Sequence, residues 1–182
     1  MMEKVVLPEQ RTRLTDEEVI ARCPWATTGR THHRTPNIIT SLELDPAEME
    51  KRNIHLQKKY AEIEENEVRF EELHCEDAEY LIVAFGSCAR IAQKAMEMAR
   101  EEGIKVGLLR PITLWPFPSK AIAARAAQVK GILTVELNAG QMVEDVRLAV
   151  KCKVPVEHFG RLGGIVPDPD EVITALKEKL IK

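Results

Sequence analysis

Four residues that could take part in chemistry gather at the end of one apolar stretch, positions 131–137: Glu136 lies within it near its end, and Asn138, Gly140 and Gln141 follow it. In an open α/β sheet, ligands and partner loops meet at the carboxyl ends of the strands. We expect Asn138 to bond its own loop and Gly140 to permit a close turn into the next helix. Glu136 could bind a ligand or a loop of a neighbouring subunit. No histidine or lysine lies beside these residues to complete an acid–base pair, so we favour a structural or interface role and assign no catalytic residue.

Gly86 and Ser87 follow a second apolar stretch, at positions 80–85. The free backbone N–H groups at the start of a helix can bind an anion such as phosphate. The sequence here contains neither the G-x-G-x-x-G pattern of dinucleotide sites nor the G-x-x-x-x-G-K-[ST] pattern of P-loops. We therefore interpret Gly86 as a tight turn and Ser87 as a helix cap, and anion binding remains the alternative.

His32 and His33 lie between Arg30 and Arg34. These cationic and imidazole groups could meet a phosphate or a carboxylate. A metal site would need further ligands, and the H-E-x-x-H pattern of zinc peptidases is absent. We interpret this segment as a solvated polar loop and assign no metal site.

Trp115 and Phe117 alternate with two prolines in the segment 114–118. Proline restricts the backbone, and the two aromatic rings offer a large apolar area. The segment could close the core of its own domain or contact another subunit. We favour the subunit contact.

Composition narrows the class of protein. The chain has 182 residues, of which 45% are hydrophobic and 30% charged, as expected for one domain with a core and an additional arm. Its net charge of −3 leaves no positive excess to neutralise phosphates, so we expect no nucleic-acid partner. No apolar run is long enough to cross a membrane, and the N-terminus has no apolar signal core, so we expect a cytoplasmic location.

The four cysteines, Cys23, Cys75, Cys88 and Cys152, are far apart and form no C-x-x-C pair. Iron–sulfur clusters and structural zinc sites usually take closely spaced cysteines. We therefore expect reduced, buried thiols and no cluster held within this chain.

The chain is expected to have three parts. Residues 1–44 contain several prolines and glycines and no clear periodicity, which indicates an irregular arm. Residues 45–66 begin with Asp45 as N-cap and Pro46 at the first helical position, and the many charges indicate a surface or bridging helix. Residues 67–182 alternate between strand and helix patterns, which is typical of βαβ units and a parallel sheet.

Five strands are expected in this last part, at 68–73, 80–85, 105–109, 132–137 and 154–159. Stretches that are apolar throughout, such as 80–85, indicate strands covered by helices on both faces of the sheet. The first stretch is half polar, so we place it antiparallel at an edge.

Four stretches resemble the α-subunit of 2-oxoacid:ferredoxin oxidoreductases, in particular of the 2-oxoisovalerate and 2-oxoglutarate type. They are 28–33 with 49–52 and 58–59, then 80–87, 106–118 and 135–142. They occur in the order of the family, and the last two together are the most specific. The Tyr-Pro-Ile-Thr-Pro motif of the family's pyrimidine domain is missing, as are the Gly-Asp-Gly…Asn signature and the ferredoxin-like cysteine runs.

The resemblance implies a transketolase C-terminal-like domain, preceded in residues 1–44 by the tail of a pyrimidine domain. Such a domain has three α/β/α layers and a five-stranded, mostly parallel sheet in the order 1-3-2-4-5, with strand 1 antiparallel. The family's catalytic residues have no matching positions here. The interface or ligand-adjacent candidates remain those described above: Gly86, Ser87, Trp115, Phe117, Glu136, Asn138, Gly140 and Gln141.

The implied enzyme has several subunits and converts a 2-oxoacid and coenzyme A to an acyl-CoA, CO₂ and reduced ferredoxin. Thiamine diphosphate, Mg²⁺, [4Fe-4S] clusters and coenzyme A belong to the implied complex, and we expect this chain to bind no cofactor and to be inactive alone. Its partners would be the β, γ and δ subunits and, through them, ferredoxin, in a homo- or hetero-oligomer.

Two other hypotheses stay open. The chain could be a stand-alone α/β module that binds a phosphate-bearing cofactor such as coenzyme A at Gly86–Ser87 and Gly140–Gln141. It could also be the equivalent domain of another thiamine enzyme, such as a transketolase.

Overall fold

The computed structural model describes residues 9–10, 12–27 and 35–181. The chain divides into two units, Met1–Lys51 and Arg52–Lys182. His32, His33 and the two arginines that flank them lie outside the described residues, as does the whole stretch 28–33. The interpretation of that segment therefore stays a prediction.

Among the described residues of the arm before Asp45, the chain forms a short helix, α1 (Asp16–Arg22), so the arm is not irregular throughout as expected. Thr15 Oγ1 accepts from the backbone N–H of Glu18 at 3.3 Å, and Glu18 Oε2 accepts from the backbone N–H of Thr15 at 2.9 Å. This reciprocal capping box satisfies two donors that the start of a helix otherwise leaves free. The Thr-x-x-Glu spacing of Thr15 and Glu18 could have predicted this helix start, but the segment has no clear apolar periodicity to support a helix.

Helix α2 (Pro46–Asn66) begins and ends where the sequence predicts. Asp45 Oδ1 accepts from the backbone N–H groups of Ala47 and Glu48, at 2.8 and 3.1 Å. No residue of α2 is buried, which agrees with a surface or bridging helix. The division between the two units falls within this helix.

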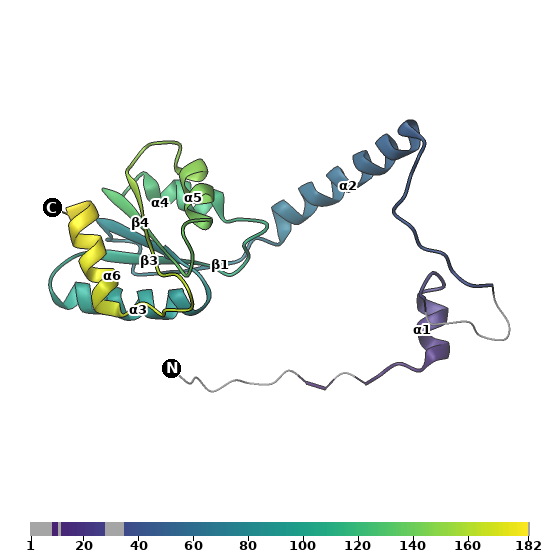
Figure 1. Cartoon of the computed structure of the whole chain (residues 1–182), viewed down its shortest axis with the longest axis horizontal. Helices are drawn as coiled ribbons and strands as arrows, with labels where there is room; N and C mark the ends of the chain where they lie inside the picture. The colour runs from purple at the N-terminus through teal and green to yellow at the C-terminus, as the bar shows by residue number, and fades with distance from the viewer. Residues whose placement is uncertain (1–8, 11, 28–34, 182) are drawn as a thin grey trace. The chain divides into compact units, whose positions relative to one another are not determined.

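The second unit is built on a five-stranded sheet in the order β1-β3-β2-β4-β5, within the part of the chain that the structure describes (Figure 1). The strands are β1 (Phe70–Leu73), β2 (Tyr80–Ala84), β3 (Val106–Pro111), β4 (Gly131–Glu136) and β5 (Val156–Gly160). β1 pairs with β3 antiparallel, and the remaining pairs are parallel. The order and the antiparallel first strand are those that the family resemblance implies.

Helices cover both faces of this sheet. They are α3 (Gly86–Glu101), α4 (Ser119–Ala126), α5 (Met142–Val150) and α6 (Pro169–Leu176), which continues into the π-helical turn η1 (Lys177–Ile181). α3 and α6 pack on one face against Ile82 and Leu133, whereas α4 and α5 pack on the other against Leu81 and Ile132 (Figure 1). Successive residues of β2 and β4 thus face opposite helix layers. The three-layer α/β/α fold is confirmed.

The topology gathers several loops at one edge of the sheet. β2, β3 and β4 are parallel neighbours, so the segments that follow them all begin at their common carboxyl edge. β1 is antiparallel, and its first residue Phe70 pairs with Pro111 at the end of β3. The end of α2, which leads into β1, therefore lies at the same edge as the segment 112–118.

Candidate functional site

Glu136 is a charged side chain with only 1% exposure at the carboxyl end of β4. Its Oε2 accepts from the backbone N–H groups of Gln141 at 3.2 Å and Met142 at 2.8 Å. Its Oε1 accepts from the backbone N–H of Val143 at 3.1 Å. These donors belong to the first turn of α5, where the helix dipole also favours a negative charge. The carboxylate therefore fixes the turn between β4 and α5, which is a structural role.

The residues between Glu136 and α5 shape this turn as the sequence predicts. Asn138 Oδ1 accepts from the backbone N–H of Gly140 at 2.7 Å, which closes a side-chain-mediated turn. Gly140 has a φ of +113°, a conformation that other residues rarely adopt. Gln141 precedes α5, and its exposed side chain makes no capping hydrogen bond. Of the three candidates with polar side chains in this turn, Glu136, Asn138 and Gln141, only Gln141 is exposed and thus open to a partner.

His158 of β5 completes the buried cluster, although the sequence pattern does not single it out. Its Nδ1 lies 3.4 Å from Glu136 Oε1 and 3.2 Å from Thr134 Oγ1. Thr134 and His158 are register partners of the parallel strands β4 and β5. Only the expected pairing of β4 with β5 could have predicted this contact, because no spacing along the chain brings His158 to Glu136. A carboxylate and an imidazole do meet here, but the carboxylate is enclosed and already occupied by the start of α5.

The sequence predicts a tight turn at Gly86 and a helix cap at Ser87, and the structure agrees with the first and not with the second. Gly86 has a φ of +56°, so the tight turn after β2 is confirmed. Ser87 is not the helix cap, because α3 begins at Gly86 and the N-cap position is occupied by Phe85 without any side-chain hydrogen bond. The helix thus begins two residues before the position that a Ser87 cap would give, and Gly86 at its start has a positive φ. Both residues are exposed, and no acidic side chain lies in the first turn of α3.

The segment 112–118 divides between the core and the surface. Phe117 is half-buried and packs against the core cluster under α4 and α5. Trp115 is 55% exposed and meets Tyr60 of α2 edge to face, with ring centroids 5.6 Å apart. Thr113 Oγ1 accepts from the backbone N–H of Arg69 at 3.0 Å, which ties the segment to the start of β1. Phe117 therefore closes the core, whereas Trp115 remains exposed and can contact a partner.

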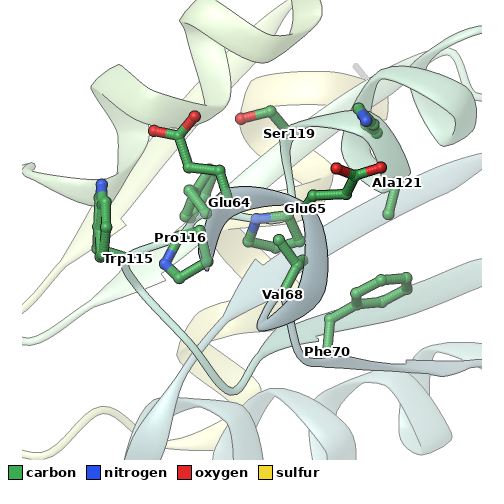
Figure 2. A pocket seen from close by; sticks show the side chains of 11 residues that line it. Glu64, Glu65, Val68, Phe70, Trp115, Pro116, Ser119 and Ala121 are labelled. Carbon is green, nitrogen blue, oxygen red and sulfur yellow. The ribbon is translucent and has the colours of Figure 1, made fainter. Parts of the chain in front are cut away.

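A pocket of about 730 Å³ lies beside this segment (Figure 2). It is lined by Glu64, Glu65, Val68, Phe70, Trp115, Pro116, Phe117, Pro118, Ser119, Lys120 and Ala121. These residues come from the end of α2, from β1 and the residues before it, from the segment after β3 and from the start of α4. All belong to the second unit.

After the pair between Glu136 and His158, the Glu72–Arg125 ion pair is the least exposed ion pair in the described part of the chain. Arg125 Nη2 and Nε donate to the Glu72 carboxylate at 2.6 and 2.8 Å, and these side chains are 19% and 23% exposed. The bonded guanidinium lowers the pKa of Glu72 below its ordinary value. Burial raises the pKa of the nearby Cys75 thiol to about 11, against an opposing contribution from Arg125. This group holds β1 to α4 and shows no open ligand site.

No three His, Cys, Asp or Glu side chains gather closely enough to hold a metal ion in the part of the chain that the structure describes. All four cysteines are free thiols, and Cys75 and Cys88 are buried as expected, but the expectation is wrong for Cys152, which is exposed, and for Cys23, which is only partly buried. The described residues thus do not fit a [4Fe-4S] cluster or a Mg²⁺ site, and we derive no chemical step through either. Nor does any helix in these residues combine the length and apolar content needed to cross a bilayer.

Comparison with known families decides the membership of this chain. The model of the pyruvate:ferredoxin oxidoreductase core domain II matches residues 78–172, more than half of the sequence. The chain belongs to this family. The matched core domain II region runs from just before β2 into α6, so it includes β2 to β5 and the turn held by Glu136.

Curated relatives of this core domain II chain are subunits of oxidoreductases. The ketoisovalerate oxidoreductase subunit VorB of Methanothermobacter thermautotrophicus is 46% identical over 165 residues, which cover 89% of this chain and 46% of VorB. The 2-oxoglutarate synthase subunit KorA of Archaeoglobus fulgidus is 32% identical over 143 residues, which cover 77% of this chain and 40% of KorA. The chain thus spans about half the length of the curated relatives it matches.

Solved structures agree with the core domain II fold. A 2-oxoglutarate:ferredoxin oxidoreductase from Magnetococcus marinus, with 2-oxoglutarate, coenzyme A and succinyl-CoA bound, has a TM-score of 0.65 and 26% identity. The match covers 75% of this chain and 24% of that chain. A split-gene transketolase has a TM-score of 0.54 at 20% identity, covers 62% of this chain and 41% of that chain, and supports the fold alone.

Proposed function

We propose that this chain is a non-catalytic structural and assembly domain of a thiamine-diphosphate-dependent 2-oxoacid:ferredoxin oxidoreductase. The complex would convert a 2-oxoacid and coenzyme A to an acyl-CoA and CO₂, and pass the electrons released to ferredoxin in the cytoplasm. The observation that carries the proposal is the 46% identity to VorB across 89% of this chain. The same relative favours a branched 2-oxoacid such as 2-oxoisovalerate as substrate.

The chemistry of the described residues supports a non-catalytic role. The carboxylate of Glu136 is 1% exposed and accepts from three backbone amides, so it is not open to a substrate and is already engaged in holding the start of α5. Thiamine diphosphate, Mg²⁺ and the [4Fe-4S] clusters would be held by other domains and by the β, γ and δ subunits. Residues 1–44 would be the tail of a pyrimidine domain, and residues 45–66 a helical linker to the α/β domain of residues 67–182.

The carboxyl edge of the sheet is the surface proposed to face those subunits. Gly86, Ser87, Gln141 and Trp115 are all exposed and follow the parallel neighbours β2, β4 and β3. The remaining candidates would hold this surface in place without contacting the partner themselves: Phe117, Glu136, Asn138 and Gly140.

The experiment is to purify the tagged chain from its source cells and identify the proteins that accompany it. The preparation is then assayed for coenzyme A-dependent reduction of ferredoxin with 2-oxoisovalerate, 2-oxoglutarate and pyruvate in parallel. We expect stoichiometric partner subunits, activity with the branched 2-oxoacid, and no activity of the chain produced alone. Recovery of the chain without partners and without activity on any of the three substrates would overturn the proposal.

Coenzyme A binding by this chain alone is the second candidate, favoured by one observation. The first turn of α3 has no capping side chain and no acidic residue, so its N–H groups remain available to an anion. Calorimetric titration of the full chain with coenzyme A separates the two functions. A dissociation constant in the micromolar range would favour a ligand-binding module, whereas no heat of binding is expected of an assembly domain.

A further inference from the structure

The pocket beside Trp115 combines an apolar floor with an acidic rim. Phe70, Phe117 and the segment's prolines form its apolar lining, and Glu64 and Glu65 contribute the carboxylates. Figure 2 shows Trp115 on one side of the opening, Phe70 on the other and the two carboxylates above them. Its volume of about 730 Å³ falls within the range of roughly 300–1,000 Å³ that binding pockets occupy, so it can hold more than one side chain.

The walls of this pocket are held in place by contacts within the second unit. The edge-to-face contact between Tyr60 and Trp115 joins α2 to the segment after β3. The backbone N–H groups of Ile112 and Thr113 donate to the carbonyl of Arg69, at 2.9 and 3.1 Å. A partner would therefore meet a largely preformed surface, which lowers the entropic cost of binding.

The pocket lining carries more negative than positive charge, because Glu64 and Glu65 stand against one cation, Lys120, which forms no ion pair with either in the described structure. The last turn of α2 contains no basic residue, although the carbonyl end of a helix favours cations. Glu64 and Glu65 form no ion pair with any residue that the structure describes, in contrast to Glu67, which pairs with Arg69 at 3.2 Å. Two carboxylates and the negative end of a helix dipole thus lie next to an exposed indole. This combination complements a cation that also has an apolar, planar face.

We propose that this pocket receives a polypeptide segment of another subunit in which an arginine stands beside a large apolar side chain. The guanidinium lies over the indole of Trp115 and bonds to Glu64, whose carboxylate lies on the Trp115 side in Figure 2. Glu65 adds negative charge on the Phe70 side, and the apolar side chain contacts Phe70 and Phe117. Arginine fits better than lysine because its planar group both stacks on aromatic rings and forms paired bonds with carboxylates. The inference rests on the proposed function, because it takes the partner to be a subunit of the oxidoreductase.

The first test measures how charge reversal at the rim changes the affinity of this chain for its purified partner subunits. We expect Glu64→Lys with Glu65→Lys to weaken binding at least about tenfold, and the matched Gln variants to weaken it less and to flatten its salt dependence. Glu101→Lys with Glu178→Lys is the control, since both residues are exposed on α3 and η1 outside the pocket. An affinity equal to that of the control would overturn the inference.

The second test identifies the occupant by photo-crosslinking in the assembled complex from p-benzoylphenylalanine introduced at position 119, an exposed serine of the pocket lining that the proposed contact does not use. We expect a crosslinked peptide from another subunit that contains an arginine next to a large apolar residue. A peptide from a second copy of this chain, or one without arginine, would overturn the inference. Failure of the unsubstituted chain to bind any subunit would remove the proposed function as well, whereas normal binding by the rim variants would remove this inference alone.

Discussion

The carboxylate of Glu136 and the backbone N–H of Met142 share a hydrogen bond of 2.8 Å between the end of β4 and the start of α5. Two further amides of the same turn donate to this carboxylate. A single side chain therefore satisfies three donors of α5 and closes the turn that carries Gln141. The position of the exposed Gln141 therefore depends on the buried carboxylate of Glu136.

Replacing Glu136 should destabilise the domain strongly. We expect Glu136→Ala to lower the free energy of unfolding by about 3 kcal/mol, because it removes charge-assisted bonds and leaves buried donors without a partner. Glu136→Gln should cost less, since one acceptor oxygen remains. Urea unfolding of the three proteins measures the difference. A loss below about 0.5 kcal/mol for the alanine variant, the size of an ordinary surface substitution, would contradict this role of the carboxylate.

The Glu72–Arg125 pair should make stability depend on pH in the acid range. The pKa of Glu72 is lowered in the folded protein by its bond to Arg125. Its contribution is therefore complete above the ordinary pKa of 4.5 and is lost as the pH falls through the lower folded value. We expect Glu72→Gln to cost about 2 kcal/mol at pH 7, and the difference from the unsubstituted protein to shrink below pH 4.5.

Unfolding free energies of both proteins between pH 3 and pH 7 test this dependence. The matched control is Glu97→Gln, which disrupts an exposed pair whose atoms are 3.6 Å apart. Such a pair contributes little, so this variant should follow the unsubstituted protein at every pH. A pH-independent difference for the Glu72 variant would refute the assignment.

Gly86 should tolerate substitution according to backbone preference rather than side-chain size. No atom lies within 4 Å of a Cβ built at this position, so the cost comes from its φ of +56° alone. We expect Gly86→Ala to cost about 1 kcal/mol, Gly86→Asn less and Gly86→Val more. Thermal unfolding of the three variants measures the ranking. Equal melting temperatures for the asparagine and valine variants would contradict it.

Trp115 and Gln141 should matter more for assembly than for folding. Both side chains are exposed. We expect Trp115→Ala and Gln141→Ala to reduce binding to the partner subunits while each changes the unfolding free energy by less than about 1 kcal/mol. Phe117→Ala is the comparison, because loss of this half-buried ring should lower the free energy of unfolding more than it lowers binding to the partner subunits. Normal complex formation together with a lowered melting temperature would contradict the assembly role.

Three cysteines, Cys75, Cys88 and Cys152, should react with thiol reagents in an order set by burial. Cys152 is exposed, whereas burial keeps Cys75 protonated by raising its pKa to about 11. Burial also raises the pKa of Cys88. At pH 8 we therefore expect iodoacetamide to modify Cys152 rapidly, and Cys75 and Cys88 only after unfolding. Peptide mapping by mass spectrometry follows the order, and early modification of Cys75 would refute it.

Several elements were predictable because their signals are local. β2 and β4 are continuous apolar stretches, and α2 begins at an Asp–Pro pair that restricts where a helix can start. The strand order came from the family resemblance rather than from any residue pattern. α1 was missed because its signal is one capping box without apolar periodicity, and Ser87 was misplaced because α3 begins at Gly86, two residues before the position that a Ser87 cap would give.

By itself, then, the sequence determined the family, the alternation of strands and helices and the polar residues at the carboxyl edge. These follow from local preferences and from the period with which apolar residues recur. The tertiary structure alone decided that Glu136 meets His158, that Phe117 is covered while Trp115 is exposed, and that the end of α2 forms a pocket with the segment after β3. Such relationships join residues far apart in the chain, so they depend on strand order and register, which no single stretch of sequence contains.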